Sequence, residues 1–234
     1  MTEAESPSRA HRVVIFGAGQ GARTATRYLH DDTDHEVVGY VVDAEFVGNG
    51  SLDGKPVVAV GDATSAFPPA TVHAFVPLGS TNLNALRAEK YALLKTLGYR
   101  FISYVHSSVR AYPDFVCGEN CFILDGQTVN YGVSIGANVV MWSGCHLGDG
   151  SRIEDDAFLA SHVVLNGEVV IGRGSFLGSN CTISRGITLG AESFIGANAL
   201  ITADTAPGAV HIVQATPAAP MTSRKFVKLM RNRF

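Results

Sequence analysis

Asp149 and Gly167 have the residue types that a group-transfer reaction needs. A carboxylate can take up a proton as a general base, and a glycine leaves its backbone N–H open to a developing oxyanion. The two residues are 18 positions apart, in a series that also contains Tyr131 and Arg185 at the same spacing. The series predicts a base beside an oxyanion donor, and a solvated turn aspartate is the alternative interpretation.

His146 and His162 are the two histidines of the same region. His162 takes a position that neighbouring repeats fill with glycine or asparagine, so we expect it to close a turn. His146 directly precedes Leu147 and should point outward, where it is either solvated or lines a cleft between subunits. The two are 16 residues apart and no third histidine joins them, so we expect no metal site.

A glycine-rich turn near the start is the third segment with possible chemistry. Gly17-x-Gly19-x-x-Ala22 follows a short apolar run, and such glycines admit a phosphate to backbone N–H groups at a helix start. Asp43 ends the next apolar run and could bind a ribose or a base. The pattern favours a nucleotide over a redox dinucleotide, because about 95 residues are too few for a full dinucleotide fold. A tight turn without any ligand satisfies the pattern equally well.

A six-residue ladder defines the element that holds Asp149 and Gly167. An apolar residue recurs at every sixth position, and small or β-branched residues fill the position four further on. This period matches neither a helix nor a free strand, so it indicates a repeating coil of about 18 residues. The ladder predicts a triangular parallel β-helix in which Asp149 lies beside Gly167 in the next coil. Its apolar positions are Cys117, Ile123, Val129, Ile135, Met141, Leu147, Ile153, Leu159, Leu165, Ile171, Leu177, Ile183, Leu189, Ile195 and Ile201.

The first hundred residues alternate between strand and helix patterns. We expect strands over 12–16, 36–43, 72–78 and 100–105, and helices over 20–29 and 82–97. Ser80 or Thr81 should cap the second helix, and Gly98 should end it. The alternation predicts a small parallel α/β domain. Pro113 and Asp114 mark the expected change to the repeat.

The composition is that of a compact soluble protein, with 46% hydrophobic residues, 17% charged residues and a net charge of −3. That charge predicts no general attraction to nucleic acid or anionic membranes. No apolar run reaches the ~20 residues of a membrane span, and the start lacks a signal peptide's apolar segment, so we expect a cytoplasmic protein. The four cysteines occupy inward ladder positions and should pack there, with a metal or redox role as the alternative, and we expect no disulfides: Cys117, Cys121, Cys145 and Cys181.

The ladder fails after Ile201, and the remaining residues differ in character. Pro207, Pro217 and Pro220 indicate an extended strap. Residues 223–234 form a basic tail, which is either an amphipathic helix on the core or on a neighbouring subunit, or an element facing phosphate or a membrane. Its basic residues are Arg224, Lys225, Lys228, Arg231 and Arg233.

Four stretches, together with the glycine turn and the ladder, give the chain a family resemblance. They are 79–91, 118–124, 141–148 (Met-Trp-Ser-Gly-Cys-His-Leu-Gly) and 160–167 (Ala-Ser-His-Val-Val-Leu-Asn-Gly). The layout resembles the left-handed β-helix N-acyltransferases that acetylate nucleotide-linked 4-amino sugars, as in bacillosamine and perosamine biosynthesis. The resemblance implies a Rossmann-like domain over 1–108, a left-handed β-helix over 109–206, and a strap and tail over 207–234.

The resemblance also implies substrates and an assembly. In this family the α/β domain holds the nucleotide diphosphate of the amino sugar, which maps onto Gly17, Gly19 and Asp43. Acyl-CoA, commonly acetyl-CoA, is the co-substrate and lies between two prisms of a homotrimer. The thioester carbonyl is held by the backbone N–H matched to Gly167, and a histidine removes the proton of the sugar amine.

The chain departs from the family at the base. The family motif reads roughly Trp-Ser-Gly-Asn-His-Ile-Gly-His-His, and its catalytic histidine falls on Asp149, whereas the histidine three residues earlier is kept as His146. An ordinary aspartate has a pKa about 2.6 units below histidine, roughly 3.5 kcal/mol less driving force for taking a proton. Three outcomes stay open: Asp149 is the base, His146 replaces it, or the protein transfers no acyl group.

The leading hypothesis is transfer from acyl-CoA to the amine of a nucleotide-linked amino deoxy sugar. A second hypothesis is transfer to a hydroxyl or to an amine that is not on a sugar nucleotide. A third, motivated by Asp149, is a catalytically silent scaffold that binds sugar nucleotides.

Overall fold

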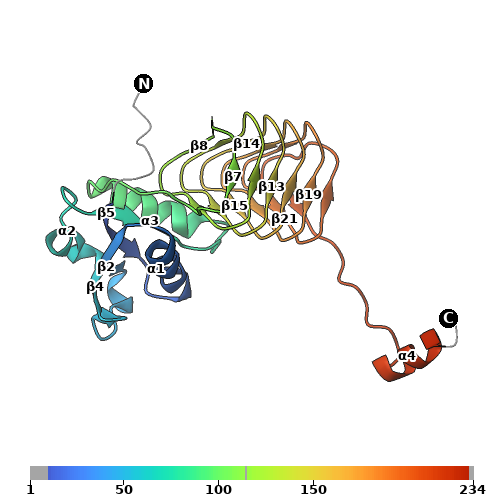
Figure 1. The fold of residues 1–234 in the computed structure, drawn as a ribbon, viewed down its shortest axis with the longest axis horizontal. Coiled ribbons are helices and arrows are strands. Elements are labelled where there is room, and N and C mark those ends of the chain that lie inside the picture. Colours follow the sequence, from blue (N-terminus) through green and yellow to red (C-terminus); the bar gives the residue numbers. More distant parts are fainter. Residues whose placement is uncertain (1–9, 114, 232–234) are drawn as a thin grey trace.

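The structure is a computed structural model, and it describes residues 10–113 and 115–231. Along the chain it has an α/β domain, a triangular β-helix and a C-terminal helix that is held away from both (Figure 1). Asp114 and Arg233, which entered the expectations above, lie outside the described residues.

The α/β domain contains a five-stranded sheet in the order β3-β4-β2-β1-β5, parallel except for β3. Alternate residues of the first strand point to opposite faces, so Val13 and Ile15 pack in one core cluster and Val14 and Phe16 in another. The elements are β1 (Arg12–Phe16), α1 (Gln20–Asp32), β2 (Glu36–Val42), a 3-10 turn (Ala44–Phe46), β3 (Ser51–Leu52), β4 (Lys55–Ala59), a second 3-10 turn (Val60–Asp62), α2 (Ala63–Ala66), β5 (His73–Phe75) and α3 (Ala85–Thr96). The predicted parallel α/β domain is confirmed.

Helix α3 begins differently from the expectation. Its N-cap is Asn84, without a side-chain cap hydrogen bond, so the prediction of Ser80 or Thr81 as the cap is wrong. Asn84 is buried and donates to the carbonyl oxygen of Gly174 in the β-helix at 2.8 Å instead. Docking against the β-helix therefore decides where α3 starts, and a sequence window around the helix does not show this contact. Gly98, with a φ of +86°, follows the helix end as predicted.

The β-helix has three flat faces, each a parallel sheet. We name them the domain face, which carries the α/β domain, the histidine face, which contains His146, and the arginine face, which contains Arg152. The domain face comprises β6 (Tyr104–Val105), β9 (Phe122–Ile123), β12 (Val140–Met141), β15 (Phe158–Leu159), β18 (Phe176–Leu177), β21 (Phe194–Ile195) and β23 (Val210–His211). The histidine face comprises β7 (Arg110–Ala111), β10 (Thr128–Val129), β13 (His146–Leu147), β16 (Val164–Leu165), β19 (Thr182–Ile183) and β22 (Leu200–Ile201). The arginine face comprises β8 (Val116–Cys117), β11 (Ser134–Ile135), β14 (Arg152–Ile153), β17 (Val170–Ile171) and β20 (Thr188–Leu189).

The register of the coils follows the ladder. Strands on one face pair at a step of 18 residues, as in Leu147 with Leu165 and Leu165 with Ile183. The large apolar residues point inward and form one core, which also takes in buried Cys121, Cys145 and Cys181, with Cys117 packed against it. The predicted triangular β-helix and the packing role of the cysteines are confirmed.

Both ends of the β-helix differ from the predicted boundaries. Strands β6 and β7 already pair with β9 and β10, so the change expected at Pro113 and the domain boundary at 108 fall inside the first coil. The predicted strand over 100–105 is divided: Phe101 bridges to β5, whereas Tyr104–Val105 joins the domain face. The last coil spans 16 residues, because Leu189 bridges to Thr205 and Ile195 pairs with His211. Because this coil is two residues shorter than the others, the six-residue spacing is lost within it. The predicted repeat therefore stopped at Ile201, although the β-helix continues to His211.

The α/β domain and the domain face share one hydrophobic core. Phe122, Val140 and Phe158 point outward from the β-helix and pack in the same cluster as Val13 and Ile15. Polar bonds surround that core: Tyr28 donates to Asp125 at 3.0 Å and Tyr104 donates to Asp32 at 2.9 Å. The two domains are thereby held in one orientation.

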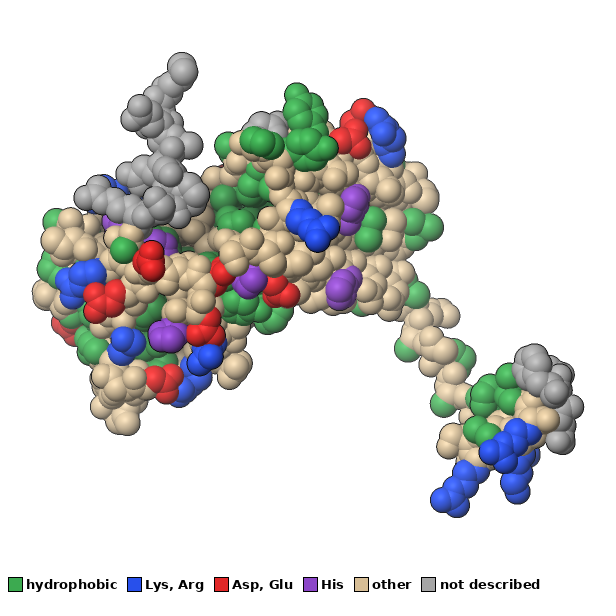
Figure 2. All heavy atoms as spheres, in the orientation of Figure 1, with side chains coloured by type: hydrophobic (Ala, Val, Ile, Leu, Met, Phe, Trp, Pro, Cys, Tyr) green, Lys and Arg blue, Asp and Glu red, His purple; other side chains and the backbone are tan. Residues whose placement is uncertain are grey.

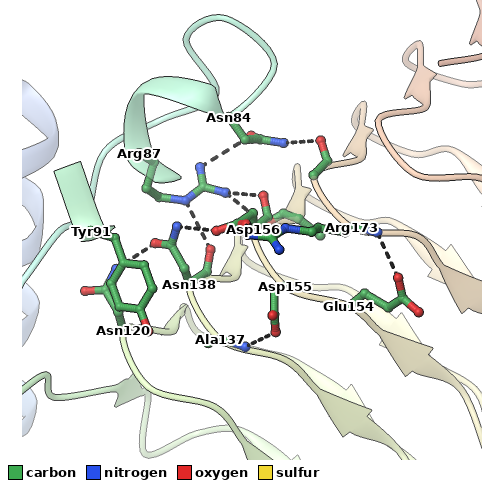
Figure 3. A network of polar contacts seen from close by, with 12 residues as sticks. Asn84, Arg87, Tyr91, Asn120, Ala137, Asn138, Glu154, Asp155, Asp156 and Arg173 are labelled. Carbon is green, nitrogen blue, oxygen red and sulfur yellow. Dashed lines mark hydrogen bonds and ion pairs between the residues drawn. The ribbon is translucent and has the colours of Figure 1, made fainter. Parts of the chain in front are cut away.

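A buried network of polar side chains holds α3 against the edge between the arginine and domain faces (Figure 3). The Asn120 side chain donates to Asn138, and the Asn138 side chain donates to Asp156. Each hydrogen bond is 2.7 Å long and joins residues one coil apart. Arg87 is fully buried beside them and donates to the backbone carbonyls of Asn138 (3.2 Å) and Asp156 (2.7 Å). Burial lowers the pKa of Arg87 to about 10, so it remains charged at neutral pH. Carbonyl dipoles rather than a direct carboxylate contact solvate this charge.

The chain leaves the β-helix after β23 in an extended strap over 212–222, so the predicted strap is present but starts later than expected: Pro207 belongs to the last coil. It then forms α4 (Ser223–Arg231), in which every residue is exposed. Figure 1 shows α4 at the end of the strap, well away from the β-helix. Among the described residues no helix is long and apolar enough to cross a bilayer.

Candidate active site

Asp149 and Gly167 lie one above the other on the edge between the histidine and arginine faces. The Glu168 N–H donates to the Asp149 carbonyl at 2.7 Å, and the Gly186 N–H donates to the Gly167 carbonyl at 2.9 Å. A β-carbon on Gly167 would stand 2.7 Å from Asp149 Oδ1, so the side chain of Asp149 occupies the space that a glycine leaves. The predicted juxtaposition is present.

The Gly167 N–H is available as a donor. Within residues 10–113 and 115–231 it has no hydrogen-bond acceptor, since the turn directs Gly186 N–H and Glu168 N–H, not its own, into the bonds between coils. Gly148 makes this stacking possible, because a β-carbon there would lie 2.5 Å from the Gly167 nitrogen. An unpaired N–H next to a carboxylate suits a carbonyl oxygen that gains negative charge.

Arg185 extends the arrangement by one more coil. Its Nη2 lies 3.9 Å from Asp149 Oδ2 and 2.6 Å from Glu168 Oε1. More than half of each of these side chains is exposed, so water screens the ion pairs and they add little stability. Their effect is positional: the guanidinium sits over Gly167 and beside the carboxylate. The 18-residue series predicted the column but not the bond to Glu168, which comes from the adjacent residue of the turn.

His146 lies on the histidine face near this edge. It pairs in register with Thr128 and Val164, and its ring is half-buried. Its backbone N–H donates to the Val163 carbonyl at 2.9 Å, and among the described residues no hydrogen bond joins its imidazole ring to Asp149 or to another group. His162 lies in a turn with a φ of +61°, as expected, and its ring covers Gly144 on the edge between the domain and histidine faces. His162 is thus on a different edge from Asp149.

The glycine turn forms a second, separate group of residues at the carboxyl ends of β1 and β2. Gly17 has a φ of +111°, a conformation that favours glycine, and its N–H donates to Val41 at 2.8 Å. Gly19 caps α1 without any side-chain bond, and a β-carbon on it would meet nothing within 4 Å. The space beside Gly19 at the start of α1 is therefore open, as a bound phosphate requires, whereas a β-carbon on Gly21 would lie 3.2 Å from the Pro77 carbonyl oxygen.

Asp43 follows β2 at the same edge and is held by Lys90. Lys90 Nζ lies 2.8 Å from Asp43 Oδ1 and 2.9 Å from Glu89, and its side chain is only 10% exposed. Burial acts against the charge of Lys90, but the bonds to Asp43 and Glu89 outweigh it and raise its pKa. Sequence reasoning did not assign Lys90 a role. The sequence feature that could have revealed this role is the position of Lys90 on the apolar face of the 82–97 helical pattern, because a lysine on such a face needs a buried partner.

The two groups of site residues do not meet within one chain. The α/β domain covers the domain face, whereas Asp149 and Gly167 lie on the one edge that this face does not adjoin. Two cavities of the described chain lie elsewhere: one of about 350 Å³ on the arginine face around Arg152 and Arg173, and one of about 280 Å³ beside His11. No cluster of described residues could hold a metal ion.

Comparison with known proteins agrees with this architecture. Two family profiles match the β-helix: the hexapeptide repeat of succinyl-transferase over residues 168–203 and the bacterial transferase hexapeptide, with six repeats, over 150–185. No curated protein matches the chain. The chain thus carries the hexapeptide repeat of bacterial transferases on a left-handed β-helix.

Solved structures extend the likeness to both domains. A variant of perosamine N-acetyltransferase from Caulobacter crescentus, determined with CoA and GDP-perosamine, matches with a TM-score of 0.76 and 24% identity, over 86% of this chain and 93% of that one. The acetyltransferase domain of PglB from Neisseria gonorrhoeae matches with a TM-score of 0.74 and 19% identity, over 90% and 100%. The chain therefore has the fold of these sugar acetyltransferases, a small α/β domain followed by a left-handed β-helix.

Proposed function

We propose that this protein transfers an acyl group from acyl-CoA to the amine of a nucleotide-linked amino deoxy sugar. The observation that carries the proposal is the Asp149 carboxylate beside the Gly167 N–H, which has no acceptor among the described residues, on an open edge of the β-helix. The likeness to structures holding CoA and GDP-perosamine supports it.

The reaction follows from the groups at this edge. The sugar amine attacks the thioester carbonyl, and the Gly167 N–H stabilises the oxyanion that forms. Asp149 or His146 removes the amine proton. Collapse of the intermediate breaks the C–S bond, and the departing CoA thiolate takes up the proton from that base and leaves as the thiol. No step needs a metal ion.

The α/β domain supplies the binding half of the site. The open N-terminus of α1 at Gly17 and Gly19 suits the diphosphate, and Asp43 suits a ribose or base hydroxyl. Lys90 keeps one oxygen of Asp43 fixed, which leaves the other to the ligand. The charged diphosphate thus binds at the glycine turn, and an uncharged hydroxyl of the nucleotide binds to Asp43.

A homotrimer with sites between subunits brings the halves together. Within one chain the α/β domain and the Asp149 edge are on different sides of the β-helix, so a second copy has to place its edge near this domain. We place the enzyme in the cytoplasm, in keeping with four free cysteines.

The test is release of CoA thiol from acetyl-CoA with a panel of amino deoxy sugars linked to GDP, UDP and dTDP, together with the solution mass. Turnover with at least one of them and the mass of a trimer are expected. No turnover and no binding with the whole panel would overturn the proposal.

A binding scaffold is the second candidate, favoured by the aspartate that stands where the family has its histidine. It predicts nucleotide-sugar binding in calorimetry without thiol release. Thiol release with an acceptor that lacks the nucleotide would instead identify the O-acyl or simple-amine alternative.

A further inference from the structure

The charges of this protein are divided sharply between the body and the tail. Residues 1–204 carry 13 Lys and Arg against 21 Asp and Glu, a net charge of −8, whereas residues 205–234 carry five basic residues and no acid, a net charge of +5. The modest total of −3 hides this division. The tail can therefore attract an anionic partner although the total charge of the protein is negative.

Helix α4 sorts the tail into two faces. Phe226 and Met230 are one turn apart with Val227 beside them, while Arg224 and Lys228 are one turn apart on the other side. Figure 2 shows hydrophobic side chains on one side of this helix and Lys and Arg side chains on the other. Phe226 is 53% exposed and Leu229 50%, which is far more than an apolar helix face retains once it is packed.

No part of the described chain covers the apolar face of α4. Every residue of the helix is exposed, and none of the ion pairs of the described residues includes its cations. Nine helical residues without a partner are marginal in water, so α4 needs a surface to be stable. The 11 residues of the strap, 212–222, can span at most about 40 Å, which gives α4 freedom to reach a surface beside the body.

We propose that α4 docks on an anionic phospholipid bilayer, with its apolar face between the headgroups and its cations against lipid phosphates. Low overall hydrophobicity, an unbroken cationic face and Phe, Leu and Met on the opposite face are the features of helices that lie in a membrane interface. Lys225 and Arg224 flank the apolar face on both sides, so their long stems can reach the headgroup level. The acidic body is repelled by the same membrane, and the strap lets it stand off.

Charge complementarity favours the bilayer over a protein surface. A helix that packs on protein needs an apolar face and tolerates acids on its exposed side, yet no acid occurs after Asp204. An anionic membrane rewards each added cation and is disfavoured by each acid, which matches the composition of the tail. The proposal concerns the tail alone and is independent of the acyl-transfer site.

Flotation of the full chain with vesicles tests the proposal. Vesicles of phosphatidylcholine mixed equally with phosphatidylglycerol should bind at least about tenfold more protein than phosphatidylcholine alone, and high salt should release it. Lys228→Glu should abolish most of the binding, whereas Arg27→Glu, which makes the same charge change on the exposed surface of α1, should not. Phe226→Ser should weaken binding at unchanged charge.

Two results would overturn the inference. Equal effects of Lys228→Glu and Arg27→Glu would show that only total charge matters. The second result is a smaller number of subunits in the assembly after removal of residues 213–234, together with no binding of the full chain to either kind of vesicle. It would assign α4 to a contact between copies. Nothing in the described body packs on α4, so these variants should leave its folding intact.

Discussion

Asp149 Oδ1 lies 2.7 Å from the point that a β-carbon on Gly167 would occupy, across one coil of the β-helix. The carboxylate and the glycine therefore depend on each other: the side chain fits because the glycine has none. The groups around this point, Asp149 and Arg185, are ends of side chains that can move, so the site can be changed without breaking the fold.

Gly167→Ala should reduce acyl transfer while the protein stays folded. The new methyl group pushes the Asp149 carboxylate aside, and a displacement of about 1 Å in a catalytic group can cost about 10²-fold in rate. Steady-state thiol release measures the loss, and circular dichroism with the solution mass serves as the control. Full activity in the folded variant would contradict the placement of the reaction at this edge.

Asp149→Asn should lower kcat by about 10²-fold or more if the carboxylate is the general base, with KM for acyl-CoA nearly unchanged. Asp149→His should retain or raise kcat, because an imidazole with an ordinary pKa of about 6.5 is a better proton acceptor at neutral pH than a carboxylate. His146→Ala is the matched variant on the neighbouring strand β13. A large loss in His146→Ala together with a small one in Asp149→Asn would transfer the role of base to His146.

Gly19→Ala should weaken nucleotide binding at least about tenfold without loss of stability. A β-carbon there meets no protein atom within 4 Å, so the methyl group enters only the space proposed for the diphosphate. Isothermal calorimetry with the nucleoside diphosphate gives the affinity. Gly61→Ala, another glycine with open space at its β-carbon, should bind normally. Unchanged affinity of Gly19→Ala would exclude this turn as the phosphate site.

Arg87→Met should destabilise the protein by about 3 kcal/mol or more. It leaves the carbonyls of Asn138, Asp156 and Gly79 without their donor, and each unsatisfied buried group costs about 1–3 kcal/mol. Chemical denaturation should show a lower midpoint and separate unfolding of the two domains. Arg27→Met, at a side chain 77% exposed on α1, should have almost no effect. Equal stability of both variants would show that α3 does not hold the domains together.

Acid should loosen the contact between the domains. Burial alone would raise the pKa of Asp32, but hydrogen bonds from Ser107 and Tyr104 outweigh it and lower the pKa. The hydrogen bond from Ser143, within the β-helix, is the main cause of the lowered pKa of Asp125, and the hydrogen bond from Tyr28 on α1 lowers this pKa across the domain contact. A carboxylate whose pKa is lowered in the folded state stabilises the fold at pH values above its unfolded-state pKa of about 3.9. This stability is lost as the pH falls through the folded-state pKa.

Denaturation midpoints between neutral and acid pH measure this effect. Asp32→Asn should be less stable at neutral pH, and its denaturation midpoint should change less with pH, because the amide side chain does not take up a proton. Asp62→Asn, at an exposed position before α2, should keep the slope of the parent protein. A parallel curve for Asp32→Asn would show that this carboxylate does not contribute.

The periodic part of the chain could be predicted closely, and its ends could not. The residues that define the ladder are local and repeat 18 positions apart, so the column Asp149, Gly167 and Arg185 followed from counting. The last coil is two residues short, and the first has Val105 and Ala111 at its apolar positions, so neither carries a clear signal. The start of α3 depends on a bond from Asn84 to Gly174, 90 residues away.

Short-range patterns were enough to predict the β-helix, the α/β domain, the inward cysteines and the glycine turn. Long-range packing decided which face of the β-helix the α/β domain covers, through Phe122, Val140 and Phe158. It likewise decided that Arg87 is buried among carbonyls, that Lys90 holds Asp43 and that the two halves of the proposed site face apart. These relations join residues far apart in the chain, where packing and desolvation, not local spacing, set which groups meet.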